Sequence, residues 1–283
     1  MTSTPTDPED RDDPGVTVVS FGSGSSGNAI LVRTPVGALL VDCGVGIRTI
    51  TAGLRAQGIG LRDLDAVLVT HEHGDHVRSL PQVLRAGVPI IATHGTQSAA
   101  RIPAAASVRI VAGTTFHAAG LAVVPLTVSH DAAEPCGFLL ERQGIGVLVV
   151  TDLGQADDGL VEPIRRSTLI VLEANHDEAM LRAGPYPAHL KRRVLSHRGH
   201  LSNADCGLTL AESLRGAPER RTVWLAHLSE TNNRPELARR TVEQHLARVG
   251  SGAVVAPLPR RSSVRWCSTE RPSPTAQLSM FAS

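Results

Sequence analysis

Hydrophobic and polar positions between residues 16 and 257 form two kinds of segment. Short apolar runs bounded by Gly, Pro or polar residues predict buried strands, whereas apolar residues three or four positions apart predict amphipathic helices. The predicted strands are 16–22, 28–34, 38–42, 66–70, 89–93, 108–111, 122–129, 137–142, 146–151, 169–173 and 223–226. The predicted helices are 47–57, 76–86, 160–166, 177–183, 188–195, 203–214 and 235–249. Strands and hairpin turns dominate the first half and later strands alternate with helices, so we expect one continuous α/β body.

Composition limits the class of protein. Of 283 residues, 42% are hydrophobic but only 2% are aromatic, so the core must consist mainly of aliphatic side chains. No apolar run approaches the ~20 residues of a membrane helix, and the N-terminus lacks the basic and apolar regions of a secretory signal. The four cysteines lie far apart without C-x-x-C spacing, which favours reduced thiols in a cytoplasmic protein.

The two ends of the chain differ from this body in charge. Residues 1–14 carry five acidic residues against one arginine, and residues 257–283 carry four arginines against one glutamate. Both ends are rich in Pro and Ser, so we expect disorder at their extremities. The expected organisation is a disordered acidic tail (1–15), a folded body (16–267) and a flexible C-terminal tail (268–283).

A dense group of potential metal ligands follows the predicted buried strand 66–70. The stretch THEHGDH places His71, His73, Asp75 and His76 within six positions. Imidazole and carboxylate suit Zn, Mn or Fe, and the absence of Cys from the motif argues against a structural zinc site. The alternative is a set of polar side chains on a surface loop, which four such residues after one buried strand disfavour.

This motif, His-x-His-x-Asp-His, resembles that of the metallo-β-lactamase superfamily. The resemblance implies a four-layer αββα sandwich with two divalent metal ions, Zn or Mn. The superfamily completes its metal sites with a later His, an Asp and a second His, and the residues in that order at predicted strand ends are His130, Asp152 and His227. By resemblance, one ion is held by His71, His73, His130 and Asp152, and the other by Asp75, His76, His227 and the same Asp152. A single His or Asp at a strand end is more often a polar turn residue, but the shared order favours the ligand interpretation.

Further motifs resemble the bacterial YycJ/WalJ subfamily over about residues 16–257. They are SGSSGN (23–28), LEANHD (172–177), GPYP (184–187), GHLSN (199–203) and HLS (227–229). The subfamily resembles tRNase Z and the phosphodiesterase PhnP in its ligand layout. This resemblance implies an exonuclease that degrades single-stranded DNA from 5′ to 3′, with residues 16–267 as its catalytic domain.

Two other functions stay open at this point. One is a small-molecule hydrolase of the same fold, acting on a cyclic phosphodiester, thioester or lactone. The other is a metal-bearing regulatory protein with little turnover, which seven intact ligands disfavour. The net charge of +1 weakens the nucleic-acid interpretation unless basic residues cluster locally, and the candidates for a cluster are Arg192, Arg193, Arg198, Arg220 and Arg221.

Several residues are candidates for roles beyond metal binding. Asp152 would bridge the ions and Asp75 would orient the attacking hydroxide. His200 is a candidate for phosphate binding or general acid catalysis, because Ser202 or Asn203 beside it could start a helix whose N-terminus attracts phosphate. Alternatively, Ser202 or Asn203 only caps that helix and His200 packs locally. His176 and Asp177 either support a metal ligand or cap the helix 177–183. The loop 22–28, which ends at Asn28, either brings backbone close to the metals or a phosphate, or forms a plain hairpin turn.

The last residues contain a different kind of motif. Gln277, Leu278, Met280 and Phe281 lie in QLSMF, which resembles the pentapeptide that binds the bacterial sliding clamp. A flexible peptide of this kind inserts its apolar side chains into a pocket and tethers the enzyme near DNA. The alternative is chance, because short motifs with tolerant positions recur often.

Overall fold

Two seven-stranded mixed sheets pack face to face in the computed structural model, which describes residues 15–217 and 221–270. The first sheet has the order β14-β1-β2-β3-β4-β5-β6 and the second β13-β12-β11-β10-β9-β8-β7. The first contains β1 (Thr17–Gly22), β2 (Ala29–Thr34), β3 (Gly37–Val41), β4 (Ala66–Leu68), β5 (Ile90–Thr93), β6 (Ser107–Ile110) and β14 (Val264–Cys267). The second contains β7 (Phe116–Ala118), β8 (Leu121–Thr127), β9 (Cys136–Arg142), β10 (Ile145–Val150), β11 (Leu169–Glu173), β12 (Thr222–Ala226) and β13 (Val254–Pro257).

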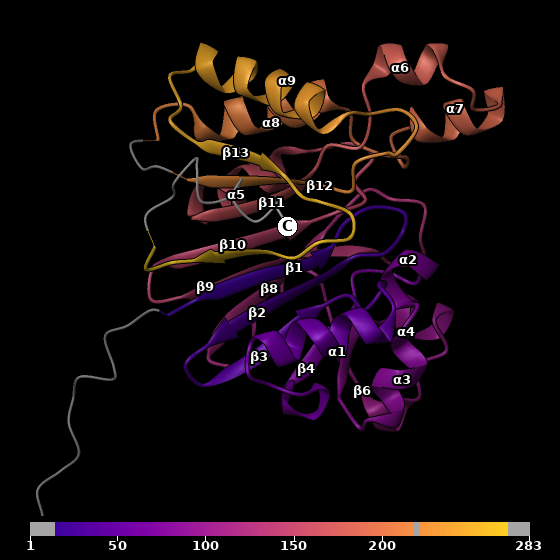
Figure 1. Ribbon diagram of the computed structural model, residues 1–283, viewed down its shortest axis with the longest axis vertical. Coiled ribbons are helices and arrows are strands. Elements are labelled where there is room, and N and C mark those ends of the chain that lie inside the picture. Colours follow the sequence, from indigo (N-terminus) through magenta and orange to yellow (C-terminus); the bar gives the residue numbers. More distant parts are fainter. Residues whose placement is uncertain (1–14, 218–220, 271–283) are drawn as a thin grey trace, which may run out of the picture.

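Helices cover the outer face of each sheet, which gives four layers (Figure 1). Against the first sheet lie α1 (Ile47–Ala56), α3 (Leu80–Arg85) and α4 (His94–Ala99), and α2 (Gly74–Val77) lies at one end. Against the second lie α5 (Val161–Arg166), α8 (Asn203–Leu214) and α9 (Pro235–Arg248), while α6 (Glu178–Ala183) and α7 (Ala188–Val194) extend from one end. Three buried clusters join the layers, one between the sheets and one under each helical layer. The predicted αββα sandwich is therefore confirmed.

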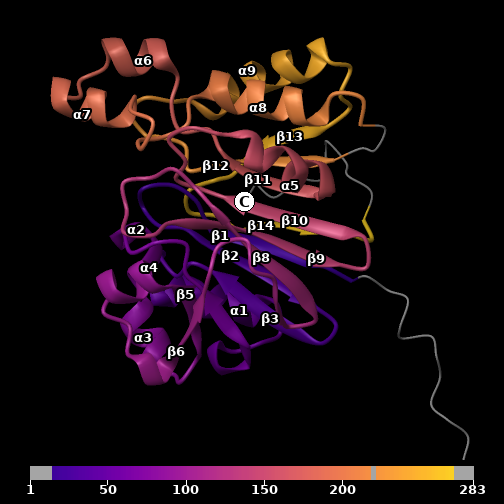
Figure 2. The same ribbon diagram turned by 180° about the vertical axis from the view of Figure 1, so that it is seen from behind.

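The parallel strands determine where the loops with the candidate ligands meet. Strands β3 to β6 are parallel in the first sheet, as are β10 to β13 in the second. Strands β4, β11 and β12 are buried at every position, which explains their continuous apolar runs. Figures 1 and 2 agree that α2, which follows β4, lies at the same end of the sandwich as α6 and α7, which follow β11.

Several predicted elements differ from the observed ones. The predicted helix 76–86 is wrong, because α2 and α3 are separate and Pro81 lies in the first turn of α3, where proline favours a helix start over continuation. Strands β7, β13 and β14 and helix α4 were not predicted; α4 reads HGTQSA and has no apolar periodicity. Residues 1–14 and 271–283, with the acidic tail and the clamp-like motif, lie outside the described residues.

Candidate metal centre and active site

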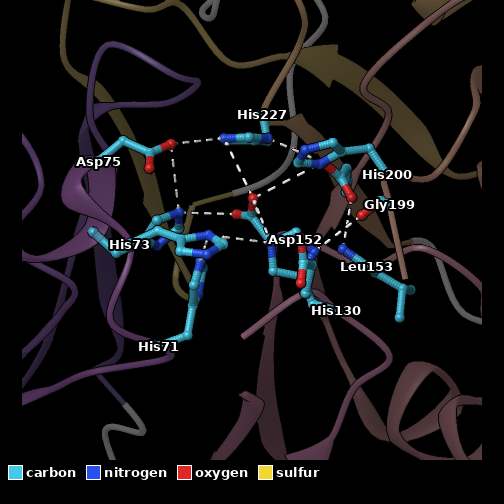
Figure 3. Close-up of polar contacts among 12 residues, drawn as sticks. His71, His73, Asp75, His130, Asp152, Leu153, Gly199, His200 and His227 are labelled. Carbon is cyan, nitrogen blue, oxygen red and sulfur yellow. Dashed lines mark hydrogen bonds and ion pairs between the residues drawn. The ribbon is translucent and has the colours of Figure 1, made fainter. Parts of the chain in front are cut away.

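Three histidines form one face of a polar cluster between the ends of the two sheets. His71 Nε2 lies 3.1 Å from His73 Nδ1, and His130 Nε2 lies 3.4 Å from the same atom. His71 and His73 come from the turn after β4, and His130 comes from the loop after β8. The ring nitrogens of these three histidines lie close enough together to hold one metal ion (Figure 3).

A second triad lies beside the first. His227 Nε2 is 3.2 Å from Asp75 Oδ2, and His76 Nε2 is 3.8 Å from the same oxygen. Asp75 and His76 lie in the short helix α2, and His227 directly follows β12. The three ligand atoms are close enough to hold a second ion, as the sequence motif predicted.

Asp152 lies between the two triads. Its Oδ2 is 2.9 Å from His76 Nε2, and its Oδ1 is 3.6 Å from His227 Nε2 and 3.7 Å from His130 Nε2. Asp152 and His227 have left-handed backbone, with φ of 54° and 53°, which is uncommon for residues other than glycine and turns their side chains toward the cluster. Although it is fully buried, Asp152 Oδ2 makes no hydrogen bond of good geometry within the described residues.

In three of the histidines of the cluster, His76, His130 and His227, the other ring nitrogen is held by a fixed partner. His76 Nδ1 donates to Asp42 Oδ2 at 2.7 Å, and His227 Nδ1 donates to Glu173 Oε1 at 3.0 Å. His130 Nδ1 donates to the carbonyl oxygen of Gly199 at 3.0 Å. In the neutral form of each ring these contacts keep the proton on Nδ1, so that Nε2 is the nitrogen that faces the cluster and can bind a metal ion.

Asp42 and Glu173 are therefore supporting residues that the sequence did not identify. Both are buried carboxylates at the end of an apolar strand, Asp42 after β3 and Glu173 at the last position of β11. The same signal, an acidic residue directly after a buried run, marked Asp152. It does not reveal which histidine each carboxylate would contact.

The electrostatics of the cluster favour a bound cation. Burial lowers the pKa of His76, but the carboxylates of Asp152 and Asp42 outweigh this and hold it well above the usual range. Burial likewise opposes protonation of His227, yet Asp152, Asp75 and Glu173 raise its pKa to about 10. Such a site attracts positive charge, and divalent metal ions supply it where Nε2 atoms and an unpaired carboxylate oxygen face one another. The residues present thus fit divalent metal binding.

His200 lies next to this cluster. Its Nδ1 is 2.8 Å from Glu173 Oε1 and 3.7 Å from Asp152 Oδ1, and its ring stacks on that of His227 at 5.3 Å. Its side chain is 20% exposed and lines a cavity of about 310 Å³ together with ligand residues of both triads. Burial lowers the pKa of His200, but Glu173 outweighs this and raises it above the usual value. His200 therefore lines the cavity beside both triads.

Comparisons with known proteins agree with this geometry. A family model described as a β-lactamase superfamily domain matches residues 38–228. The exodeoxyribonuclease YycJ of Bacillus anthracis is 36% identical over 238 residues, which are 82% of this chain and 89% of that protein. The chain belongs to the YycJ/WalJ family of the metallo-β-lactamase superfamily. It is accordingly an enzyme of the metal-dependent hydrolase class.

Two further relatives support the family and the fold. The exodeoxyribonuclease WalJ of Streptococcus pneumoniae is 32% identical over 243 residues, 83% of this chain and 90% of that protein. Among solved structures, the metallo-β-lactamase fold protein YhfI of Bacillus subtilis superposes with a TM-score of 0.68 over 90% of this chain and 99% of YhfI, at 17% identity. This structural likeness concerns the fold alone. In the parts of the chain that the structure describes, no helix has the length and hydrophobicity of a membrane span.

Of the other residues that the sequence suggested for the site, some lie at the metal-ligand cluster and others do not. Asn28 is at the cluster, since its Nδ2 lies 3.1 Å from His76 Nε2 and its backbone N–H donates to the Asp75 carbonyl. Asp177 instead caps α6, accepting a hydrogen bond from the Met180 N–H, as the second alternative for that residue predicted.

Ser202 also acts as a helix cap. Its Oγ accepts from the Asp205 N–H at the start of α8. His176 is buried, but within the described residues neither ring nitrogen makes a hydrogen bond, so it does not directly support a ligand. The loop 22–28 is tied to the cluster through Ser23, whose Oγ accepts from the His227 N–H at 2.9 Å.

Proposed function

We propose that the protein is a metal-dependent exodeoxyribonuclease that degrades single-stranded DNA from 5′ to 3′. The observation that carries the proposal is the buried Asp152 shared by two ligand triads, in a chain whose relatives are named exodeoxyribonucleases. One ion, Zn or Mn, would be held by His71, His73, His130 and Asp152, and the second by Asp75, His76, His227 and Asp152. When bound, such a pair activates water and neutralises the charge of the phosphate oxygens.

Side chains of the protein take the remaining roles in the proposed reaction. Asp152 lies between the triads and fixes their separation. Asp75 is partly exposed, with 21% of its side chain accessible, and lines the cavity, so its carboxylate is placed to orient an attacking water. Buried Glu173, Asp42 and the Gly199 carbonyl hold the histidine rings in orientation and so preserve the geometry during turnover.

His200 is the candidate general acid. Its Nδ1 is engaged by Glu173, which leaves Nε2 as the nitrogen that can donate a proton to the leaving oxygen. The pKa of His200, raised mainly by Glu173 against the effect of burial, favours the protonated ring that this role requires. Glu173 acts as a positioning residue, because its oxygens contact His200 and His227 rather than the cavity.

The second candidate is hydrolysis of a small phosphodiester, thioester or lactone. The cavity volume of about 310 Å³ favours it, since this lies at the small end of pockets for small ligands. An exonuclease accommodates only the end of its substrate in such a cavity, while the rest of the strand lies outside. The two functions therefore differ in whether contacts outside the cavity contribute to substrate binding.

The test compares wild type with Asp152→Ala and with Asp158→Ala, a matched control in which an exposed carboxylate is removed. Substrates are 5′- and 3′-labelled single-stranded DNA, matched RNA and bis-p-nitrophenyl phosphate, each with Mn and with Zn. We expect stepwise DNA loss with early release of the 5′ label in wild type and control, and none in Asp152→Ala. Cleavage of the small diester alone would refute the nuclease proposal and favour the second candidate.

Clamp binding through Gln277, Leu278, Met280 and Phe281 is also proposed, from the sequence motif. A peptide of residues 272–283 should bind the bacterial sliding clamp with micromolar affinity. The double substitution Gln277→Ala with Phe281→Ala should abolish this. Absence of binding by the unchanged peptide at high micromolar concentration would refute the interaction.

A further inference from the structure

The segment from α6 to α7 carries a concentration of positive charge that the net charge of +1 conceals. Residues 182–198, here called the basic hairpin, contain no Asp or Glu and five cations: Arg182, Lys191, Arg192, Arg193 and Arg198. Figures 1 and 2 show α6 and α7 extending from the body at the end of the sandwich where α2 lies. The charge is therefore gathered beside the metal centre.

The base of the basic hairpin is fastened to the loop that carries a metal ligand. The Arg198 guanidinium donates to the backbone carbonyl of His130 at 3.2 and 3.3 Å. The carbonyl of His197 accepts from Ser129 Oγ at 2.6 Å, and Arg193 lines the same cavity as His130. Arg193 is therefore within reach of a strand whose end lies in this cavity.

Two cations of α7, Arg192 and Arg193, make no contact that the fold needs. None of the residues of α7, all within the described chain, is buried. Arg192 is exposed and makes no ion pair within the described residues, and the partner of Arg193 is Asp131, half-exposed like Arg193 itself, at 3.1 Å. An ion pair so exposed contributes little stability, so a phosphate can replace Asp131 at small cost.

The sequence suggested two other arginines for a basic patch: Arg220 lies outside the described residues, and the structure excludes Arg221. Arg221 is 6% exposed, and its guanidinium donates to the backbone carbonyls of Ser167 and Arg165. Its charge serves the core around α5 and is not available to a ligand. Among the described cations, Arg193 of the hairpin lines the cavity itself.

We propose that the basic hairpin binds the backbone phosphates of the nucleic-acid strand outside the cavity, with Arg193 nearest the cleaved bond and Arg192 farther along the strand. This inference rests on the proposed nuclease function and assigns its substrate path. Phosphates repeat along a strand regardless of sequence, and exposed arginines neutralise them with release of bound counterions. The hairpin therefore contributes binding without base specificity.

The test measures how KM for a single-stranded oligonucleotide depends on salt, in the full chain with its metals bound. The variants are Arg192→Gln with Arg193→Gln, Arg192→Gln alone, and the charge-preserving Arg192→Lys with Arg193→Lys. The matched control is Arg55→Gln with Arg62→Gln, two exposed arginines between β3 and β4, at the opposite end of β4 from the ligands. Hydrolysis of bis-p-nitrophenyl phosphate by each protein serves as the reference for the chemical step.

We expect the slope of log KM against log salt to fall by about 1.4 in the double Gln variant and about 0.7 in the single one. Between roughly 50 and 200 mM salt, wild type should then lose about sevenfold more affinity than the double variant. The Lys variant and the remote control should keep the wild-type slope. In the Gln variants the ratio of oligonucleotide turnover to bis-p-nitrophenyl phosphate turnover should therefore fall below that of wild type.

Two results would overturn the proposal, and they differ in what else they affect. If wild type degrades DNA and the double Gln variant keeps both its slope and its substrate ratio, the strand does not follow the hairpin, while the nuclease function stands. If wild type hydrolyses only the small diester, the nuclease function fails and the proposed path fails with it.

Discussion

Replacing Glu173 by glutamine should destabilise the metal-free protein by about 3 kcal/mol. Glu173 is fully buried, and its Oε1 accepts hydrogen bonds from His200 Nδ1 and His227 Nδ1 while its Oε2 accepts from two backbone N–H groups. A glutamine side chain has one oxygen, so its amide group would face two N–H donors and leave them unsatisfied. Two charge-assisted hydrogen bonds at about 1.5–3 kcal/mol each are lost.

The pKa of Glu173 gives a second measure of the same effect. Burial raises this pKa, but His200 and His227 outweigh burial and lower it from 4.5 to about 2. That change corresponds to about 3 kcal/mol of stability. Because the folded-state pKa is lowered, the contribution is present above pH 4.5 and is lost as the pH falls toward 2.

Urea unfolding of chelator-treated protein at neutral pH measures this free energy. The matched control is Glu141→Gln, which removes a carboxylate paired with Arg166 at the surface and should cost less than ~1 kcal/mol. With metals restored, Glu173→Gln should also lower activity by about 10- to 100-fold, because two rings lose their orienting acceptor. A loss of stability no larger than that of the control would refute the role assigned to Glu173.

Three further substitutions test neighbouring parts of the site. Asp42→Asn should weaken metal affinity by about 10- to 100-fold in a chelator competition titration, because His76 loses its charged acceptor; unchanged affinity would contradict that support. Gly44→Ala should lower the free energy of unfolding in urea by more than ~3 kcal/mol, because its Cβ would lie 1.6 Å from a carbonyl oxygen of α2. Gly46→Ala, whose Cβ would meet open space, serves as the control; equal stabilities of the two variants would show that the packing is looser. His200→Gln should lower kcat on DNA by about 10²- to 10⁴-fold. In wild type the activity should fall at a pH above the usual histidine pKa, and the variant should not show this fall; a variant that keeps it would exclude His200 as the acid.

The sequence predicted most of the site because its ligands follow buried strands. The motif at His71–His76 and the residues His130, Asp152 and His227 each leave the core at a strand end. Strands β4, β10 and β12 belong to parallel pairs, whose ends meet at one edge of a sheet, whereas β8, which precedes His130, pairs antiparallel with both of its neighbours. Their convergence in the structure follows from this topology. The assignment of each residue to one of two ions stays a prediction.

The supporting contacts could not be predicted in the same way. Asp42 lies 34 positions from His76 and Glu173 lies 54 positions from His227, and only the folded sheets decide which strand ends are neighbours. Ser202 carried an ambiguous signal, because capping side chains and catalytic side chains are of the same chemical types. The structure resolves this ambiguity through a hydrogen bond to the backbone of α8.

Counting metal ions per chain, together with DNA hydrolysis, tests the central claim most directly. Wild type should bind two divalent ions, and His130→Ala and His227→Ala should each bind one and lose stepwise DNA degradation, while the exposed control His189→Ala should match wild type. Two bound ions with full nuclease activity in either triad variant, or DNA degradation by wild type without divalent metal, would contradict the shared two-metal centre.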